Sequence, residues 1–179
     1  SCIFLFVNYV FNHTTKFSHT TYTCVIMKTF DEPKAIRLKI MDFLSRREHS
    51  SKEIYNKMSQ RVESIEMLKN SIDELISDGL LSDERFAESY FNSRKRKGFG
   101  PIRIKNELSQ RGINENLFNK IEQDTDWTPL ALAALRKKTN GNNPEEMKEI
   151  LKVKNFLNYR GFEFQDIDKA FSILYEEKY

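Results

Sequence analysis

Cysteine, glycine and proline are scarce in this chain of 179 residues, which contains 2 Cys, 6 Gly and 4 Pro. Both cysteines, Cys2 and Cys24, lie near the start, so the rest of the chain can hold neither a disulfide framework nor a thiolate metal site. This pattern favours a reducing, cytoplasmic compartment. Few glycines leave little room for phosphate-binding loops, and no run approaches the roughly 20 apolar residues that a membrane-spanning helix needs.

A strong excess of charge of one sign is also missing. The sequence has 29 Lys+Arg and 26 Asp+Glu, a net charge of +3, while 39% of its residues are hydrophobic. That hydrophobic share is sufficient for a folded core and argues against wholesale disorder. The net charge alone does not mark a nucleic-acid-binding protein, so the distribution of charge along the chain matters more.

Residues 1–26 differ in composition from the rest of the chain. They contain one charged residue, Lys16, and the run 2–7 resembles the apolar core of a signal peptide without its basic leader or its small-residue cleavage site. Charge density and helical periodicity begin only after Met27. We therefore interpret residues 1–26 as sequence upstream of the natural start or as a poorly ordered extension. A cleaved or membrane-associating leader is the alternative.

From Glu32 onward, apolar residues recur with helical spacing, and no segment shows the alternation of a strand. Pro33, Pro101, Pro129 and Pro144 each fit the first turn of a helix, where an N–H would be unpaired in any case. The sequence predicts nine helices, near 33–46, 50–61, 63–78, 83–97, 101–111, 114–124, 129–139, 144–159 and 163–177.

Polar residues just before these starts are expected to cap the helices. Thr128 and Asn143 each precede a proline, and both are good N-cap types. The run Ser50-Ser51-Lys52-Glu53 has the capping-box pattern, in which a serine and a glutamate each bond the other's backbone N–H.

Three helix–turn–helix joints, at residues 47–54, 97–104 and 160–167, align with one another without gaps. In each, a basic residue closes one helix and an isoleucine follows seven positions later, which keeps the apolar residues on the inward faces of both helices. We therefore predict an all-α fold of tandem three-helix, helix-turn-helix-like units in an elongated array. The predicted units are 33–81, 82–126 and 127–179, with helix 129–139 as the displaced third helix of the last one.

No arrangement of residues indicates catalysis. His49 is the only histidine after residue 26, and it has no Cys or second His with which to share a metal. Acidic pairs such as Asp83 and Glu84 fit the first turns of helices, where each stabilises the helix dipole by about 0.3–1 kcal/mol. The run 98–100 joins two helices and lacks the Gly-Lys-Ser/Thr of a phosphate loop. We predict no enzyme activity, no cofactor and no metal site.

Positive charge is concentrated in the predicted middle unit. Residues 85–111 contain eight basic and two acidic side chains, a local charge of +6, whereas residues 145–179 contain six basic and eight acidic ones. We expect Lys95 and Arg96 to point outward and Lys97 to lie at a helix C-terminus. Two interpretations stay open: a solvated helix end, or a patch that contacts phosphates or acidic groups beside a mobile turn at 98–100.

The middle of the sequence also carries a specific motif. It runs Asp83-Glu84-Arg85-Phe86-Ala87-Glu88-Ser89-Tyr90, continues through Gly98-Phe99-Gly100-Pro101 and ends with Arg111-Gly112-Ile113. Supporting stretches occur at 44–54 and 156–162. Together, over about residues 34–175, these stretches resemble the RecX family of regulatory proteins. Departures are modest: an isoleucine stands at position 54 where leucine is usual, and an arginine at 111 where lysine is common.

The resemblance implies a curved array of three-helix repeats that modulates RecA, the bacterial recombinase, without an activity or cofactor of its own. The resemblance further implies binding along the groove of the RecA–single-stranded DNA filament. Such binding usually inhibits RecA, which acts in DNA repair, recombination and the SOS response. We expect a cytoplasmic monomer that binds single-stranded DNA weakly and in a salt-sensitive way on its own. The candidate RecA or DNA contacts are Arg46, Arg47, Arg94, Lys95, Arg96, Lys97, Arg103, Lys105, Arg111 and Arg160.

A helix-turn-helix transcriptional regulator is the alternative hypothesis. Helix 101–111 would then lie in the major groove and read bases through Arg103, Lys105, Asn106 and Gln110. The role of Trp127, in a predicted linker, also stays open between a hinge anchor and an exposed contact.

Overall fold

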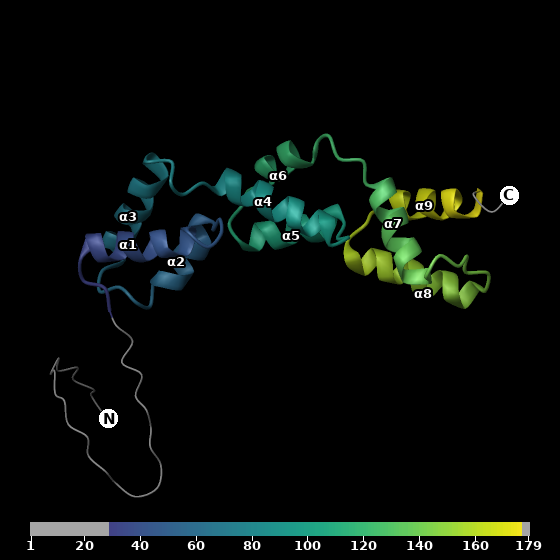
Figure 1. The fold of residues 1–179 in the computed structure, drawn as a ribbon, viewed down its shortest axis with the longest axis horizontal. Coiled ribbons are helices and arrows are strands. Elements are labelled where there is room, and N and C mark those ends of the chain that lie inside the picture. The colour runs from purple at the N-terminus through teal and green to yellow at the C-terminus, as the bar shows by residue number, and fades with distance from the viewer. Residues whose placement is uncertain (1–28, 177–179) are drawn as a thin grey trace, which may run out of the picture.

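The computed structural model describes residues 29–176, and within this range the chain forms nine helices and no strand (Figure 1). The interpretation of residues 1–26 falls outside the described residues. Phe30 and Val62 form one isolated bridge. The predicted all-α fold is confirmed. The helices are α1 (Pro33–Leu44), α2 (Ser51–Met58), α3 (Ile65–Ser77), α4 (Asp83–Arg96), α5 (Pro101–Gln110), α6 (Glu115–Glu122), α7 (Thr128–Thr139), α8 (Met147–Arg160) and α9 (Phe164–Glu176).

The start of α8 differs from the prediction. This helix begins at Met147, so Pro144 lies in the preceding loop and Asn143 does not cap a helix. The loop is instead held by α9: Asn143 Nδ2 donates to the carbonyl of Leu174 at 3.3 Å, and Tyr175 donates its hydroxyl to the carbonyl of Pro144 at 2.6 Å. Contacts with a distant helix therefore outweigh the local signal for a helix start.

The predicted caps at the other two sites also differ in part. Thr128 is the first residue of α7 rather than its cap, and its Oγ1 donates to Asp166 Oδ1 at 3.0 Å. Ser50 does cap α2, because its Oγ accepts from the N–H of Glu53 at 3.1 Å. The carboxylate of Glu53 is bound by two arginines, so only the serine half of the capping box is formed.

The helices form an arched row of three groups, α1–α3, α4–α6 and α7–α9 (Figure 1). The described chain starts at one end of the arch and finishes at the other. Helices α2, α5 and α8 lie along its lower, concave edge, while α3 and α6 lie along the upper edge. The elongated array expected from the repeat and the curvature implied by the resemblance are therefore present.

Two separate apolar clusters stabilise the row. One lies within α1–α3 and the other is continuous through α4–α9. The repeated isoleucines Ile54, Ile104 and Ile167 are 0%, 0% and 1% exposed, as the predicted inward face requires. In the last group the extra helix, α7, precedes the helix pair α8–α9 and packs against both of its helices.

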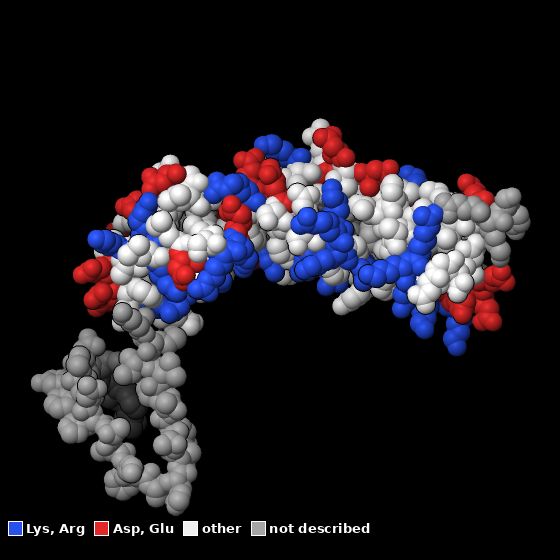
Figure 2. All heavy atoms as spheres, in the orientation of Figure 1, with Lys and Arg blue, Asp and Glu red and all other residues white. Residues whose placement is uncertain are grey.

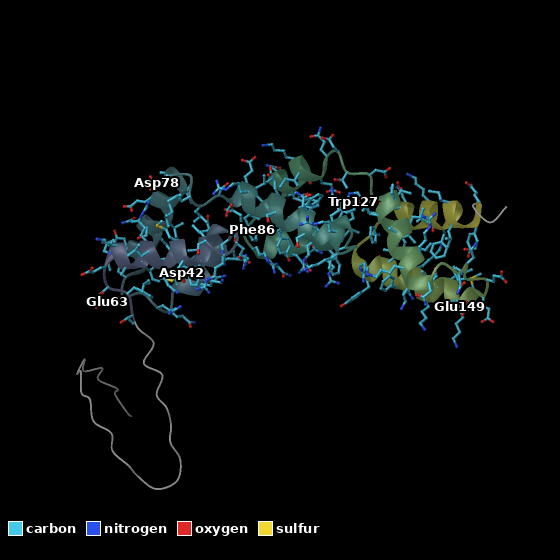
Figure 3. The ribbon with its side chains drawn as sticks, viewed as in Figure 1. Asp42, Glu63, Asp78, Phe86, Trp127 and Glu149 are labelled. Carbon is cyan, nitrogen blue, oxygen red and sulfur yellow. The ribbon has the colours of Figure 1, made fainter. Side chains whose placement is uncertain are left out.

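The single tryptophan lies at the centre of the larger cluster. Trp127 is 7% exposed and packs edge-on against Phe91 and Phe162, with ring centroids 5.7 and 6.5 Å apart. Its Nε1 donates to Glu122 Oε1 at 3.0 Å, and burial raises the pKa of Glu122. Figure 3 shows Trp127 where α6 leads into α7. It is therefore a buried anchor between the second and third groups and not an exposed contact.

Polar contacts join the first group to the second. Asp83 Oδ1, at the start of α4, accepts hydrogen bonds from the N–H of Ser51 at 2.7 Å and from its hydroxyl at 3.2 Å. Arg85 Nε pairs with Glu48 Oε1 at 3.0 Å. No buried apolar residue of the described chain is shared between the two clusters, so this joint depends on hydrogen bonds and ion pairs.

The second joint is a direct backbone contact between the α4–α5 turn and the α8–α9 turn. Gly100 N–H donates to the carbonyl of Arg160 at 2.9 Å, and Ile102 N–H donates to that of Gly161 at 3.1 Å. A Cβ on Gly100 would lie 2.3 Å from the Gly161 oxygen, and one on Gly161 would lie 2.5 Å from the Arg103 nitrogen. The turn at 98–100, expected to be mobile, is therefore packed between two helix pairs, and both glycines are needed for the approach.

Substituting Gly161→Ala should destabilise the α4–α9 cluster more than Gly141→Ala does. Both glycines have positive φ, +90° and +79°, so each alanine suffers a left-handed backbone cost of about 1–2 kcal/mol. Only Gly161 also meets backbone atoms, which adds roughly 1–3 kcal/mol of overpacking. Urea unfolding followed by Trp127 fluorescence measures this cluster directly. Equal losses in the two variants would contradict the packing argument.

His49 is buried in the turn between α1 and α2, with 2% of its surface exposed. Its Nδ1 lies 2.9 Å from the carbonyl of Arg47 and its Nε2 lies 2.9 Å from Lys57 Nζ. A carbonyl only accepts and an ammonium only donates, so Nδ1 carries the proton and Nε2 accepts. Burial, assisted by the charges of Arg47 and Lys57, lowers the pKa of His49. His49 is therefore a structural hydrogen-bonding residue of this turn.

The free energy of unfolding should fall as the pH drops below about 6.5, the ordinary pKa of histidine. In that range the unfolded chain binds a proton that folded His49 resists, so the stabilisation is complete above this pH and is lost as the pH falls toward the lowered pKa. His49→Gln should reduce this pH dependence. Urea unfolding followed by circular dichroism at pH 5.5 and 7.5 tests it, and an unchanged pH dependence in the variant would refute the assignment.

Candidate functional site

Arginines and aromatic rings form a chain of contacts that runs across all three helix groups. It begins at Glu53 in α2, whose carboxylate pairs with Arg47 at 2.8 Å and with Arg111 at 3.3 Å. Arg111 closes α5 and belongs to the second group, and its carbonyl accepts the hydroxyl of Ser50 at 2.7 Å. Its guanidinium also lies over the ring of Tyr90, 4.6 Å from the centroid. The first two groups are thereby connected through one glutamate and one arginine.

Glu107 of α5 is the centre of the chain of contacts. One carboxylate oxygen binds Arg94 Nε at 2.7 Å and accepts the hydroxyl of Tyr90 at 2.9 Å, and the other binds Arg103 Nε at 3.1 Å. Burial acts to raise the pKa of Glu107, but the hydrogen bonds from Tyr90 and Arg103 and the charge of Arg94 hold that pKa below its ordinary value. The carboxylate is therefore ionised and fixes both arginines.

Phe99, in the α4–α5 turn, lies under three guanidinium groups. Those of Arg94, Arg103 and Arg160 are 5.2, 4.5 and 5.4 Å from its ring centroid. Arg160, at the end of α8, also donates through Nη1 to the carbonyls of Lys97 at 2.9 Å and of residue 98 at 3.0 Å. Arginine favours such stacked arrangements because its flat, weakly hydrated charge packs on aromatic faces.

The chain of contacts ends on α8 and α7. Arg103 lies over Tyr159, 5.2 Å from the ring centroid, while Arg160 and Lys138 lie over Phe156 at 4.7 and 5.1 Å. We call the whole set the arginine–aromatic band. Its members are Arg47, Glu53, Tyr90, Arg94, Phe99, Arg103, Glu107, Arg111, Lys138, Phe156, Tyr159 and Arg160.

The band carries an excess of positive charge. Its six cations, five arginines and one lysine, are balanced by only the two carboxylates of Glu53 and Glu107, which leaves +4. Figure 2 shows the same asymmetry on the surface: Lys and Arg atoms gather along the lower, concave edge, where α2, α5 and α8 lie. Acidic atoms lie mainly along the upper edge and at the two ends. The concave edge therefore suits an anionic partner.

The ten predicted contact residues fall into two sets. Five of them belong to the band. Of the rest, Arg46 pairs with Asp42 within α1 at 3.0 Å, and Lys105 pairs with Glu115 of α6 at 2.6 Å. Arg96 and Lys97 are exposed, with no acidic partner in the described part of the chain. The band members among them are Arg47, Arg94, Arg103, Arg111 and Arg160.

Lys95 does not point outward as predicted. It is half-buried, and its ammonium lies over the ring of Phe91, 5.3 Å from the centroid. A lysine four residues after a phenylalanine on a helix can cover that ring with its stem, so the local spacing contained this signal. Arg94 is half-buried as well: its guanidinium lies over the ring of Tyr90, 5.1 Å from the centroid, and its Nε pairs with Glu107 at 2.7 Å.

Several band members were not identified from the sequence. Glu107 lies four residues after Arg103, and Tyr90 four residues before Arg94, so these two helical pairs were readable from spacing. Phe156 lies four residues before Arg160 on α8, so its contact with Arg160 was predictable from the same spacing, whereas its contact with Lys138 of α7 was not. Tyr159 gave no such signal, because its partner Arg103 comes from α5.

Other classes of site find no support in residues 29–176. No group of three or more His, Cys, Asp or Glu side chains there is arranged to hold a metal ion. In the same range, no helix has both the length and the apolar character to cross a membrane.

Known proteins resemble this chain along most of its length. The family model for the second three-helix domain of RecX matches residues 82–120, and the model for the third matches residues 128–171. Regulatory protein RecX of Pseudomonas entomophila (strain L48) is 35% identical over 144 residues, which cover 79% of this chain and 93% of that protein. The Pseudomonas tolaasii protein of the same name is 39% identical over 140 residues, covering 77% and 90%.

Solved structures show the same fold. The crystal structure of RecX from Lactobacillus salivarius matches with a TM-score of 0.70 and 24% identity, over 79% of this chain and 96% of that one. A second crystal structure of a regulatory protein RecX matches with a TM-score of 0.65 and 21% identity, over 76% and 70%. With tandem three-helix repeats and relatives of this identity and coverage, the chain belongs to the RecX family of regulatory proteins.

Proposed function

We propose that this protein binds the RecA–single-stranded DNA filament and inhibits RecA in DNA repair, recombination and the SOS response. Membership of the RecX family supports a regulatory role. The observation that carries the proposal further is the positive concave edge of an elongated arch, because a filament of RecA on DNA presents both an anionic polymer and a repeating protein surface (Figure 2).

The arch explains how weak contacts would add up. Three similar helical units, which we take to be residues 33–81, 82–126 and 127–179, would contact successive subunits of a helical filament. Each contact after the first is then intramolecular, so the overall affinity exceeds that of any single unit. One monomer suffices for this mode of binding, and the proposed setting is the cytoplasm.

Binding to free single-stranded DNA is expected to be weak and sensitive to salt. Non-specific electrostatic binding to nucleic acid typically reaches a Kd of only about 10⁻⁴–10⁻⁶ M at physiological salt. The cations of the band share two carboxylates, which further limits the charge available to phosphates.

Reading of duplex sequence by α5 has less support. Of the four side chains assigned to base reading, Arg103 is held by Glu107 and Phe99, and Lys105 is held by Glu115. A recognition helix needs side chains free to reach base edges in the major groove. Only Asn106 and Gln110 are exposed without such a partner in the described chain.

Substoichiometric amounts of the purified protein should suppress the DNA-dependent ATPase of RecA. We expect this result because one molecule would block extension at the end of a filament or cover several RecA subunits. A titration of ATP hydrolysis by RecA on single-stranded DNA measures it. An unchanged rate at an equimolar ratio would refute the proposed function.

Reversing charge at Arg96→Glu with Lys97→Glu should weaken binding to the filament and to single-stranded DNA. Loss of two phosphate contacts should lower the slope of log affinity against log salt by about 1.4. The melting temperature should hardly change, because both side chains are exposed.

The matched control is Lys69→Glu with Lys169→Glu, which makes the same change in net charge at two exposed lysines of α3 and α9 that have no acidic partner in the described part of the chain. If both double variants lose the same affinity, the effect is one of overall charge and the exposed cations at the end of α4 have no special role.

A further inference from the structure

Tyr159 has the largest exposed fraction, 76%, among the large hydrophobic side chains of residues 29–176. It lies in the last turn of α8, directly before Arg160 of the band. A large aromatic side chain left in water loses the stabilisation that burial would provide, and no core of the described chain requires it there. Its exposure therefore points to a role in binding and not in stabilising the fold.

One side of the Tyr159 ring is packed against Arg103. The guanidinium of Arg103 lies 5.2 Å from its centroid, and Arg103 Nη1 donates to the Tyr159 carbonyl at 3.5 Å. Arg103 is itself fixed, with Nε on Glu107 at 3.1 Å and its guanidinium 4.5 Å from the Phe99 ring. Phe99, Arg103 and Tyr159 therefore make a layered series that is half-buried at one end and open to solvent at the other.

An exposed ring backed by a cation is suited to stack on another flat π system. Nucleobases are such systems, and every base has a face that can stack. In a duplex these faces are covered by neighbouring base pairs, so only an unpaired base can use the ring fully. The surroundings suit an anionic backbone, since Lys97 is exposed and Arg160 donates to the described chain only through Nη1, leaving Nε and Nη2.

We propose that Tyr159 is a stacking platform for an unpaired nucleobase of single-stranded DNA, with Arg160 and Lys97 contacting the flanking phosphates. The inference rests on the part of the proposed function that places nucleic acid against the concave edge. It assigns single-stranded DNA to this edge as its ligand. Positive charge alone would not distinguish such a strand from any other polyanion.

The test uses the protein alone, with fluorescence anisotropy on a labelled oligothymidine and on an abasic oligomer of the same length. Both carry the same phosphates, and only the first carries bases. Wild-type protein should bind oligothymidine more tightly. Tyr159→Ala should weaken oligothymidine binding roughly 5- to 150-fold, as expected for about 1–3 kcal/mol per stacked base. It should leave binding of the abasic oligomer unchanged.

Two control variants sharpen the result. Tyr159→Phe keeps the ring and should retain wild-type affinity for oligothymidine. Phe164→Ala removes a side chain that is 70% exposed at the start of α9, and it should have no effect. Trp127 fluorescence during urea unfolding should show that all three variants remain as stable as the wild type.

Equal binding of the two oligomers by wild-type protein, or an equal loss for both in Tyr159→Ala, would overturn the platform. So would a Tyr159→Ala defect confined to RecA filaments, since that would assign the ring to a protein surface. RecA is absent from the oligomer assay, so the two ideas fail separately. Base-dependent binding without ATPase suppression refutes filament inhibition alone, and suppression without base dependence refutes the platform alone.

Discussion

The direct backbone contact between Gly100 and Gly161 fixes the geometry on which the rest of the molecule depends. It brings the start of α5 against the end of α8, which places Arg103 over Tyr159 and Arg160 over Phe99. It also lets the apolar cluster continue without interruption from α4 to α9. A side chain at either glycine would separate the helix pairs, so packing and the arrangement of the concave edge share one cause.

Shared carboxylates are the second organising feature. Glu53 and Glu107 each bind two arginines, so the cations are held in order without being fully neutralised. Glu107 of α5 binds Arg94 of α4, and Glu53 of α2 binds Arg111 at the cap of α5, so the bonds that order the cations also connect α2, α4 and α5. Stability of the arch and its electrostatic character are therefore coupled.

The sequence was sufficient for the helices and the repeat, because both depend on local spacing: apolar periodicity, prolines at helix starts and the isoleucine seven residues after each basic residue. It was not sufficient for contacts between distant residues. The approach of Gly100 to Gly161 and of Arg103 to Tyr159 joins positions about 60 residues apart, and the repeat pattern of these segments does not indicate that they touch. The same holds for the start of α8, where bonds from α9 hold the Pro144 loop outside the helix.

The two joints of the arch differ in kind, and this has a mechanical consequence. Apolar packing runs through the second joint, whereas hydrogen bonds and ion pairs such as those of Asp83 and Arg85 make the first. Individual polar bonds contribute only about 0.5–1.5 kcal/mol and ion pairs at the surface weaken with salt. The first joint is thus the weaker of the two, and added salt should loosen the attachment of α1–α3 before it affects the packing within α4–α9.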